Sequence, residues 1–150
     1  MPLTISVEHC APLIERELWP LLEQHREELT TDKARMVLAP DVAKYDAMEQ
    51  AGIFVGLIAR LDGRIVGYSG NFIGQHLHYS RLRYAENDVL YVDPEQRGTL
   101  GLRIISATED TMRERGAEVM LWHAKPDTQL AKLLPLRKYR VQDIMYSGVL

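Results

Sequence analysis

Apolar residues recur at helical spacing in two stretches near the start of the chain. In residues 12–29, large apolar side chains return every three or four positions, as they do when one face of a helix packs on a core. A shorter stretch, residues 41–50, has the same character and stops before Gly52. These two patterns predict two helices.

The next pattern is typical of strands. Residues 53–60 and 65–73 are two apolar runs, and Asp62-Gly63 between them is typical of a tight hairpin turn. A polar loop at residues 74–84 then leads to a short apolar run at residues 88–92. We therefore expect a hairpin followed by a third strand.

The second half of the chain alternates helical and strand patterns. Its expected elements are a helix at 100–115 capped by Gly116, a strand at 119–123, a helix at 127–136 and a final strand at 141–149. A crossover helix joins the strands at 88–92 and 119–123, so these two strands should be parallel. The order of elements predicts a mixed α+β fold.

Length and composition limit the possible classes of protein. A chain of 150 residues with 46% hydrophobic residues fits one domain, residues 1–150. No apolar run approaches the roughly 20 residues that span a bilayer, and the N-terminus does not resemble a secretory signal. We therefore expect a cytoplasmic protein without membrane contact. The net charge of −3 argues against nucleic-acid binding, and Cys10, the one cysteine, cannot form an internal disulfide.

The most informative segment is the turn between the strand at 88–92 and the following helix. It reads Gln96-Arg97-Gly98-Thr99-Leu100-Gly101. A short polar turn that opens a helix aims unpaired backbone N–H groups at one point, where the helix dipole is positive. Such a turn can hold a phosphate group. The same glycines could equally serve turn geometry alone.

This run resembles the acetyl-CoA signature of the GCN5-related N-acetyltransferases, written Q/R-x-x-G-x-G/A. Gln96 and Gly101 match its first and last positions, whereas Thr99 replaces its middle glycine and Gly98 stands beside it. The order of helices and strands also resembles the whole acetyltransferase domain, and Val92-Asp93-Pro94-Glu95 resembles the segment that leads into its cofactor loop.

The resemblance implies a fold, a cofactor and a reaction. The fold is a mostly antiparallel twisted sheet with helices on both faces, in which one parallel strand pair is splayed to hold acetyl-CoA. The reaction moves an acetyl group from acetyl-CoA to a primary amine of a small molecule or protein, by direct attack in a ternary complex and without a metal. By resemblance, Tyr91 and Val92 contact the acyl group and the pantetheine arm, and the Val92 N–H stabilises the oxyanion. The residues implied around the pyrophosphate are Arg97, Gly98, Thr99, Leu100, Gly101 and Leu102.

Acetyl transfer to an amine needs a base that removes a proton from the amine. Glu86 and Asp88 lie two residues apart near the start of a strand, so their side chains should share one face, and either could be the base. His78 is the next candidate, because histidine exchanges protons near neutral pH. Ordinary capping or loop roles explain Glu86 and Asp88 equally simply, and a solvated loop position explains His78 more simply. We discount a metal site at His76 and His78, since no cysteine or carboxylate cluster adjoins them.

The departing thiolate benefits from an acid, which is usually a tyrosine of the last helix in the family. Leu134 occupies that position here and cannot donate a proton. Tyr79, Tyr139 or Tyr146 could substitute for it, although packing would explain all three.

Two further expectations follow from the departures and from the last strand. The missing acid and the exchange at Thr99 leave room for a second hypothesis, a catalytically weak or inactive module of the same fold that binds a protein partner. The strand at 141–149 would offer an edge for pairing, so a homodimer is possible.

Overall fold

A computed structural model describes residues 2–150 and contains one five-stranded sheet, ordered β1-β2-β3-β4-β5. The strands are β1 (Leu3–Glu8), β2 (Phe54–Leu61), β3 (Arg64–Gln75), β4 (Arg83–Val92) and β5 (Val119–Trp122). Neighbouring strands are antiparallel except β4 and β5, which are parallel. The predicted mixed α+β fold and its parallel pair are confirmed.

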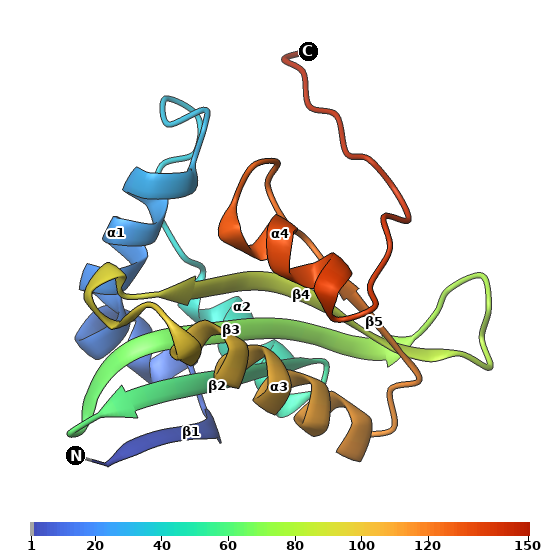
Figure 1. The fold of residues 1–150 in the computed structure, drawn as a ribbon, viewed down its shortest axis with the longest axis horizontal. Helices are drawn as coiled ribbons and strands as arrows, with labels where there is room; N and C mark the ends of the chain where they lie inside the picture. Colours follow the sequence, from blue (N-terminus) through green and yellow to red (C-terminus); the bar gives the residue numbers. More distant parts are fainter. Residues whose placement is uncertain (1) are drawn as a thin grey trace.

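Helices cover both faces of the sheet (Figure 1). They are α1 (Trp19–Leu29), α2 (Val42–Gln50), α3 (Thr99–Glu114) and α4 (Gln129–Leu136). A 3-10 turn at Ala11–Leu13 and a π-helical turn at Ile14–Leu18 precede α1. The helix predicted from residue 12 is therefore present, but its first turns are irregular.

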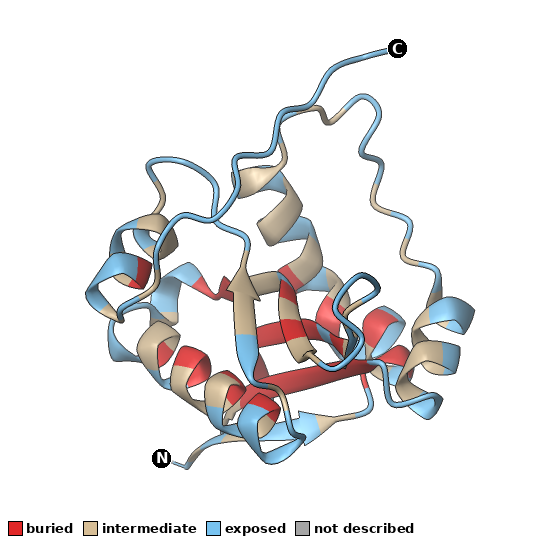
Figure 2. Cartoon of the chain, turned by 90° about the vertical axis from the view of Figure 1, so that its right-hand side faces the viewer, coloured by how far each residue is buried: buried red, intermediate tan, exposed pale blue. Residues whose placement is uncertain are grey.

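The core forms two layers, one on each face of the sheet (Figure 2). Leu18 and Leu21 pack against Ile58 on the face that α1 covers. Leu100 and Ile104 of α3 pack on the opposite face. The apolar spacing of both helices is thus explained by burial against the sheet.

Turn residues adopt the conformations that the sequence predicts. Asp62 and Gly63 have φ angles of 51° and 82°, as a two-residue hairpin turn requires. Gly116 has a φ of 89° just beyond α3, where a left-handed residue ends a helix.

A β-bulge in β4 is the main irregularity of the sheet. Gly70 of β3 faces Val89, but Asn71 faces Asn87, so Asp88 is an extra residue without a partner in β3. The bulge reverses which face the following side chains occupy. As a result, Val89 turns toward the α1 layer, and the buried Asn87 amide donates to the Val89 carbonyl at 3.0 Å.

Three expectations need correction. The N-terminal strand β1 was not predicted, because a six-residue strand of alternating, half-exposed residues gives a weak pattern. The loop expected at 74–84 is shorter, since β3 continues to Gln75 and β4 begins at Arg83. The final strand predicted at 141–149 is wrong for this structure: these residues follow α4 as an exposed extended segment. Strand formation depends on a partner edge, which local sequence does not specify.

Candidate active site

The site begins where β4 and β5 separate. Their parallel pairing ends at Asn87 and Trp122, while β4 continues beside β3 to Val92. We call residues 88–92 together with the end of β5 the β4–β5 fork. The Asp93 N–H donates to the Val66 carbonyl at 2.9 Å, which makes Val92 part of a non-hydrogen-bonded pair with β3. The N–H and C=O of Val92 therefore face into the fork.

The glycine turn lies directly beyond the fork. Gly98 has a φ of 127°, a conformation that side chains rarely adopt, and α3 begins at Thr99. Thr99 is thus the first helical residue, and Gly98 supplies the conformational freedom of the turn. A Cβ built on Gly98 or Gly101 meets no atom of the described residues within 4 Å. The space in front of the N–H groups that start α3 is open.

The end of α1 is tied to both sides of the fork. The Arg97 guanidinium pairs with Glu28 at 2.7 and 2.5 Å, and its Nε donates to the Val92 carbonyl at 3.2 Å. Hydrogen bonding to the Glu28 carboxylate raises the pKa of Arg97, and the same bond lowers the pKa of Glu28. On the other side, Lys125 Nζ donates to the Leu29 carbonyl. Arg97 therefore joins the glycine turn to α1.

Two carboxylates and a histidine meet at the start of the fork. His123 Nε2 and Glu86 Oε1 share a hydrogen bond of 2.6 Å. Asp88 is exposed, but partial desolvation raises its pKa; the nearby His123 lowers this pKa and the Glu86 carboxylate raises it. Sequence reasoning missed His123. Asn87 and Trp122 are partners in the parallel pairing of β4 and β5, and Asp88 and His123 are the residues that follow them. This pairing would have indicated that His123 lies near the two carboxylates.

A buried aromatic stack forms the α1 side of the fork. The His25 ring lies on Tyr91, with centroids 4.6 Å apart, and His25 Nδ1 shares a 2.6 Å hydrogen bond with Tyr68 Oη. Burial lowers the pKa of His25 to about 4, so the ring is neutral at pH 7. Tyr68 also lines an apolar cavity of about 60 Å³, together with Tyr45, Phe54 and Val89.

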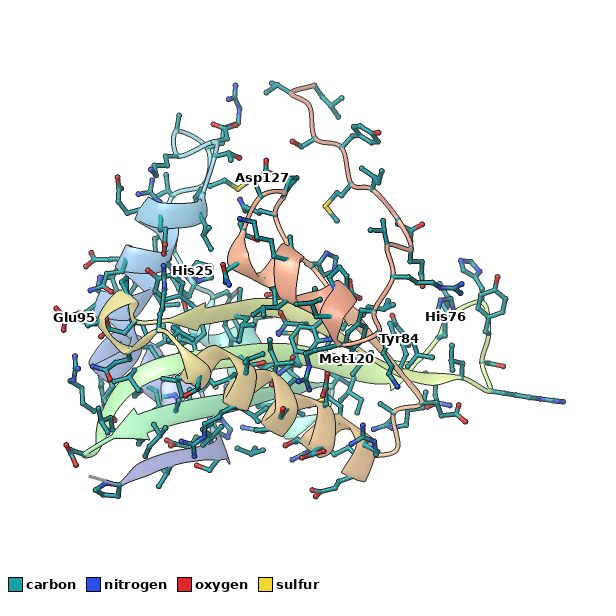
Figure 3. The ribbon with its side chains drawn as sticks, in the orientation of Figure 1. His25, His76, Tyr84, Glu95, Met120 and Asp127 are labelled. Atoms are coloured by element: carbon teal, nitrogen blue, oxygen red, sulfur yellow. The ribbon has the colours of Figure 1, made fainter. Side chains whose placement is uncertain are left out.

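The remaining catalytic candidates lie elsewhere. His78 and Tyr79 are in the β3–β4 loop, where their backbone N–H groups donate to His76 Nδ1 at 3.1 and 3.2 Å. Figure 3 shows His76 at the opposite end of the hairpin from Glu95, which precedes the glycine turn. The structure therefore does not bring His78 and Tyr79 to the fork.

The possible substitutes for the missing acid are also spread out. Leu134, which the resemblance puts in the place of the acid tyrosine, is buried on α4. The Tyr139 hydroxyl donates to Glu109 at 3.0 Å, and Tyr146 is exposed in the C-terminal segment.

The sequence matches the model of the acetyltransferase (GNAT) family over residues 15–134. This match covers the fork, the glycine turn and the helices around them. The chain belongs to the GNAT family. Members of this family in general transfer acetyl groups from acetyl-CoA. No curated protein sequence gives a match.

Solved GNAT structures share the fold over almost the whole chain. An aminoglycoside acetyltransferase from an uncultured soil metagenomic sample, in complex with sisomicin, has a TM-score of 0.76 at 22% identity, covering 99% of this chain and 96% of its own. A ribosomal-protein-alanine N-acetyltransferase from Brucella melitensis biovar Abortus has a TM-score of 0.70 at 20% identity, with 99% and 98% covered. Glucosamine-6-phosphate N-acetyltransferase from Arabidopsis thaliana has a TM-score of 0.71 at 14% identity, with 99% of both chains covered. At these identities the likeness shows the fold.

Across residues 2–150, no helix is both long and apolar enough to cross a bilayer. In the same part of the chain, no three His, Cys, Asp or Glu side chains are grouped as a metal site would require.

Proposed function

We propose that this GNAT protein transfers an acetyl group from acetyl-CoA to a primary amine of a small molecule or protein, by direct attack within a ternary complex. The observation that carries this proposal is the β4–β5 fork, which leads straight into an open glycine turn at the start of α3. This arrangement combines a strand edge for an extended arm with a helix terminus for phosphates.

The residues of the fork and turn fit acetyl-CoA. The Val92 N–H faces into the fork at the edge of β4, along which a pantetheine arm can lie like an added strand, while the Val92 carbonyl accepts from Arg97 Nε. Gly98 and Gly101 leave open space in front of the first N–H groups of α3, which suits the pyrophosphate. Acetyl-CoA, when bound, supplies the thioester whose acetyl group is transferred. The Val92 N–H is then the candidate donor to the carbonyl oxygen that gains negative charge.

The polar groups at the start of the fork fit the acceptor. Asp88 is solvent-exposed, but its partial desolvation at the fork disfavours the ionised form, so a bound ammonium group would stabilise that form. Glu86 is hydrogen-bonded to His123, and this pair can accept the proton that the amine must lose before attack. We therefore assign Asp88 to amine binding and the Glu86–His123 pair to proton removal.

Two observations bear on the chemical class of the acceptor amine. Two of the structural relatives are named for amino sugars or aminoglycosides, which are small amines, and one is named for a ribosomal protein. The apolar cavity beside Tyr68 and Val89 favours an amine that carries a small apolar group.

Calorimetric titration with acetyl-CoA, and with CoA for comparison, tests the cofactor site. Gly101→Glu places a bulky negative group in the open space, so binding should weaken at least about 100-fold while the fold persists. Ala43→Glu, an equal charge change at an exposed position of α2, is the matched control and should bind as the wild type does. Equal binding by both variants, or none by the wild type, would refute the proposed cofactor site.

Turnover with a panel of amines tests the chemistry. Asp88→Asn and Glu86→Gln keep the side-chain shapes and should lower kcat/KM by about 10²–10⁴-fold while acetyl-CoA binding remains. If wild-type protein binds acetyl-CoA yet acetylates no amine, the alternative of an inactive module that binds a partner gains support. If both variants acetylate as fast as wild type, the assigned roles are wrong.

A further inference from the structure

The apolar cavity of about 60 Å³ lies on the face of the sheet that α1 and α2 cover. A water-sized group needs about 10–15 Å³ of such space, so the cavity has room for about four heavy atoms. Large apolar side chains form most of its lining: Ile14, Leu18, Leu22, Phe54, Ile58 and Val89.

The polar side chains of the lining, apart from Tyr45, are neutral and hydrogen-bonded within the protein. Burial raises the pKa of the Cys10 thiol to about 12, so this group carries no charge at pH 7. The Tyr68 hydroxyl shares its hydrogen bond with His25, and the Ser69 hydroxyl accepts from the Asn87 amide at 3.2 Å. The cavity therefore suits an apolar group, and a hydroxyl or charge placed in it would lack a good partner.

The cavity adjoins the proposed acceptor groups. Val89 lines it and directly follows Asp88, the bulged residue of β4. A Cβ on Gly70 would lie 2.8 Å from Val89 Cγ2 and 2.9 Å from Phe54 Cζ, so these two side chains meet over Gly70. Tyr45 also lines the cavity; burial raises its pKa, and the charge of Asp88 raises it further. An acceptor nitrogen at Asp88 thus has its substituent beside the cavity.

We infer that the acceptor is a primary amine that carries a compact apolar group of about four carbon atoms, held in this cavity, and no carboxylate beside its nitrogen. The inference rests on the proposed function, because it takes the nitrogen to lie at Asp88. Glu86 and Asp88 attract an ammonium group and repel a neighbouring carboxylate. The product is an N-alkylacetamide, formed as the thioester C–S bond breaks, CoA leaves as the thiolate and the amine proton passes to the Glu86–His123 pair.

Acetylation rates with matched amines test this class of acceptor. Butylamine should exceed propanolamine in kcat/KM by about 10–100-fold, because propanolamine has a hydroxyl in place of the terminal methyl group. Norvaline, which is butylamine with a carboxylate beside the nitrogen, should be at least about 10-fold poorer than butylamine. Hexylamine exceeds the space of the cavity and should also be poorer. Acetylation of propanolamine or norvaline as fast as butylamine overturns the inference.

The same apolar group beside an amine also occurs at the start of a peptide. A peptide that begins with norvaline has the propyl group but no carboxylate near its nitrogen. Acetylation of this peptide as fast as butylamine would support the inferred class with a peptide as its source. Acetylation of butylamine alone would support it with a free amine as its source.

Opposite changes at Val89 test whether the cavity selects the amine. Val89→Ala enlarges the cavity and should move the preferred chain from butylamine toward hexylamine, whereas Val89→Leu fills it and should move the preference toward ethylamine. Val55→Ala is the control, because Val55 is buried among residues of the opposite face, such as Met112 of α3, and should keep the wild-type order of amines. Ratios between amines within one protein do not depend on the folded fraction. The same order of amines in all these proteins overturns the inference.

Calorimetry of amine binding to the protein–CoA complex separates this inference from the proposed function, because CoA without an acetyl group cannot react. Butylamine should bind at least about 10-fold more tightly than propanolamine. Such binding without acetylation by acetyl-CoA would contradict the proposed function and support the inferred class of ligand. Acetylation that favours propanolamine would contradict the inference alone, and an absence of butylamine binding overturns it as well.

Discussion

The neutral, partly buried ring of His25 leads to a specific prediction about acid stability. Its folded-state pKa of about 4 lies below the ordinary value of 6.5, because burial disfavours the imidazolium. Nearby Glu28 favours the charged form, but burial outweighs it. Protons therefore bind the unfolded chain more tightly than the folded one. The contribution of neutral His25 to stability is complete above about pH 6.5 and is lost as the pH falls toward 4.

The magnitude follows from the two pKa values. At pH 5 the histidine of the unfolded chain is mostly protonated, whereas His25 in the folded protein is mostly neutral. Between pH 7.5 and pH 5 this difference lowers the free energy of unfolding by about 2 kcal/mol. For a domain of this size, that loss corresponds to a decrease in Tm of about 4–8 °C.

Urea denaturation of wild type and His25→Gln at both pH values isolates this contribution. Glutamine keeps a polar partner for Tyr68 and does not titrate, so contributions from all other groups cancel between the two proteins. At pH 7.5 the variant should be less stable than wild type, because it lacks the ring stacked on Tyr91. On acidification to pH 5, its free energy of unfolding should fall by about 2 kcal/mol less than that of wild type. Equal losses in both proteins would show that His25 is not held neutral by burial.

Four other substitutions test the turn, the bulge and a helix cap. Gly98→Ala should lower stability by about 1–3 kcal/mol, because Gly98 has a φ of 127°. Gly101→Ala should raise stability by about 0.5–1 kcal/mol, because Gly101 lies inside α3. Changes in Tm of the same sign for both variants would contradict this. Asn87→Ala should cost about 1–3 kcal/mol in urea denaturation, because it removes the buried amide that donates to the partly buried Val89 carbonyl, and an unchanged midpoint would refute the role of the amide. Asp41→Ala should cost about 1 kcal/mol, since Asp41 accepts a hydrogen bond from a backbone N–H of α2; hydrogen exchange in the first turn of α2 should rise, and no increase would argue against the cap.

Much of the site was predictable because its signals are local. Gly98 and Gly101 mark the turn, since few other residues suit its backbone, and the crossover helix between β4 and β5 dictates that they are parallel. The spacing of Glu86 and Asp88 placed both carboxylates at the start of the fork. The hydrogen-bonding partner of Glu86 was not predictable in this way, because His123 lies 37 residues later in the chain, just after β5.

The sequence by itself determined the order of helices and most strands, the turns at Asp62-Gly63 and Gly116, and the glycine turn of the candidate cofactor site. Each depends on apolar periodicity or on a backbone conformation that few residues adopt. Only the tertiary structure decided the bulge at Asp88, the pairing of Arg97 with Glu28, and the state of residues 141–149. These features arise from contacts between distant segments. A strand in particular forms only where another edge is available, so the same apolar pattern can remain an exposed extension of the chain.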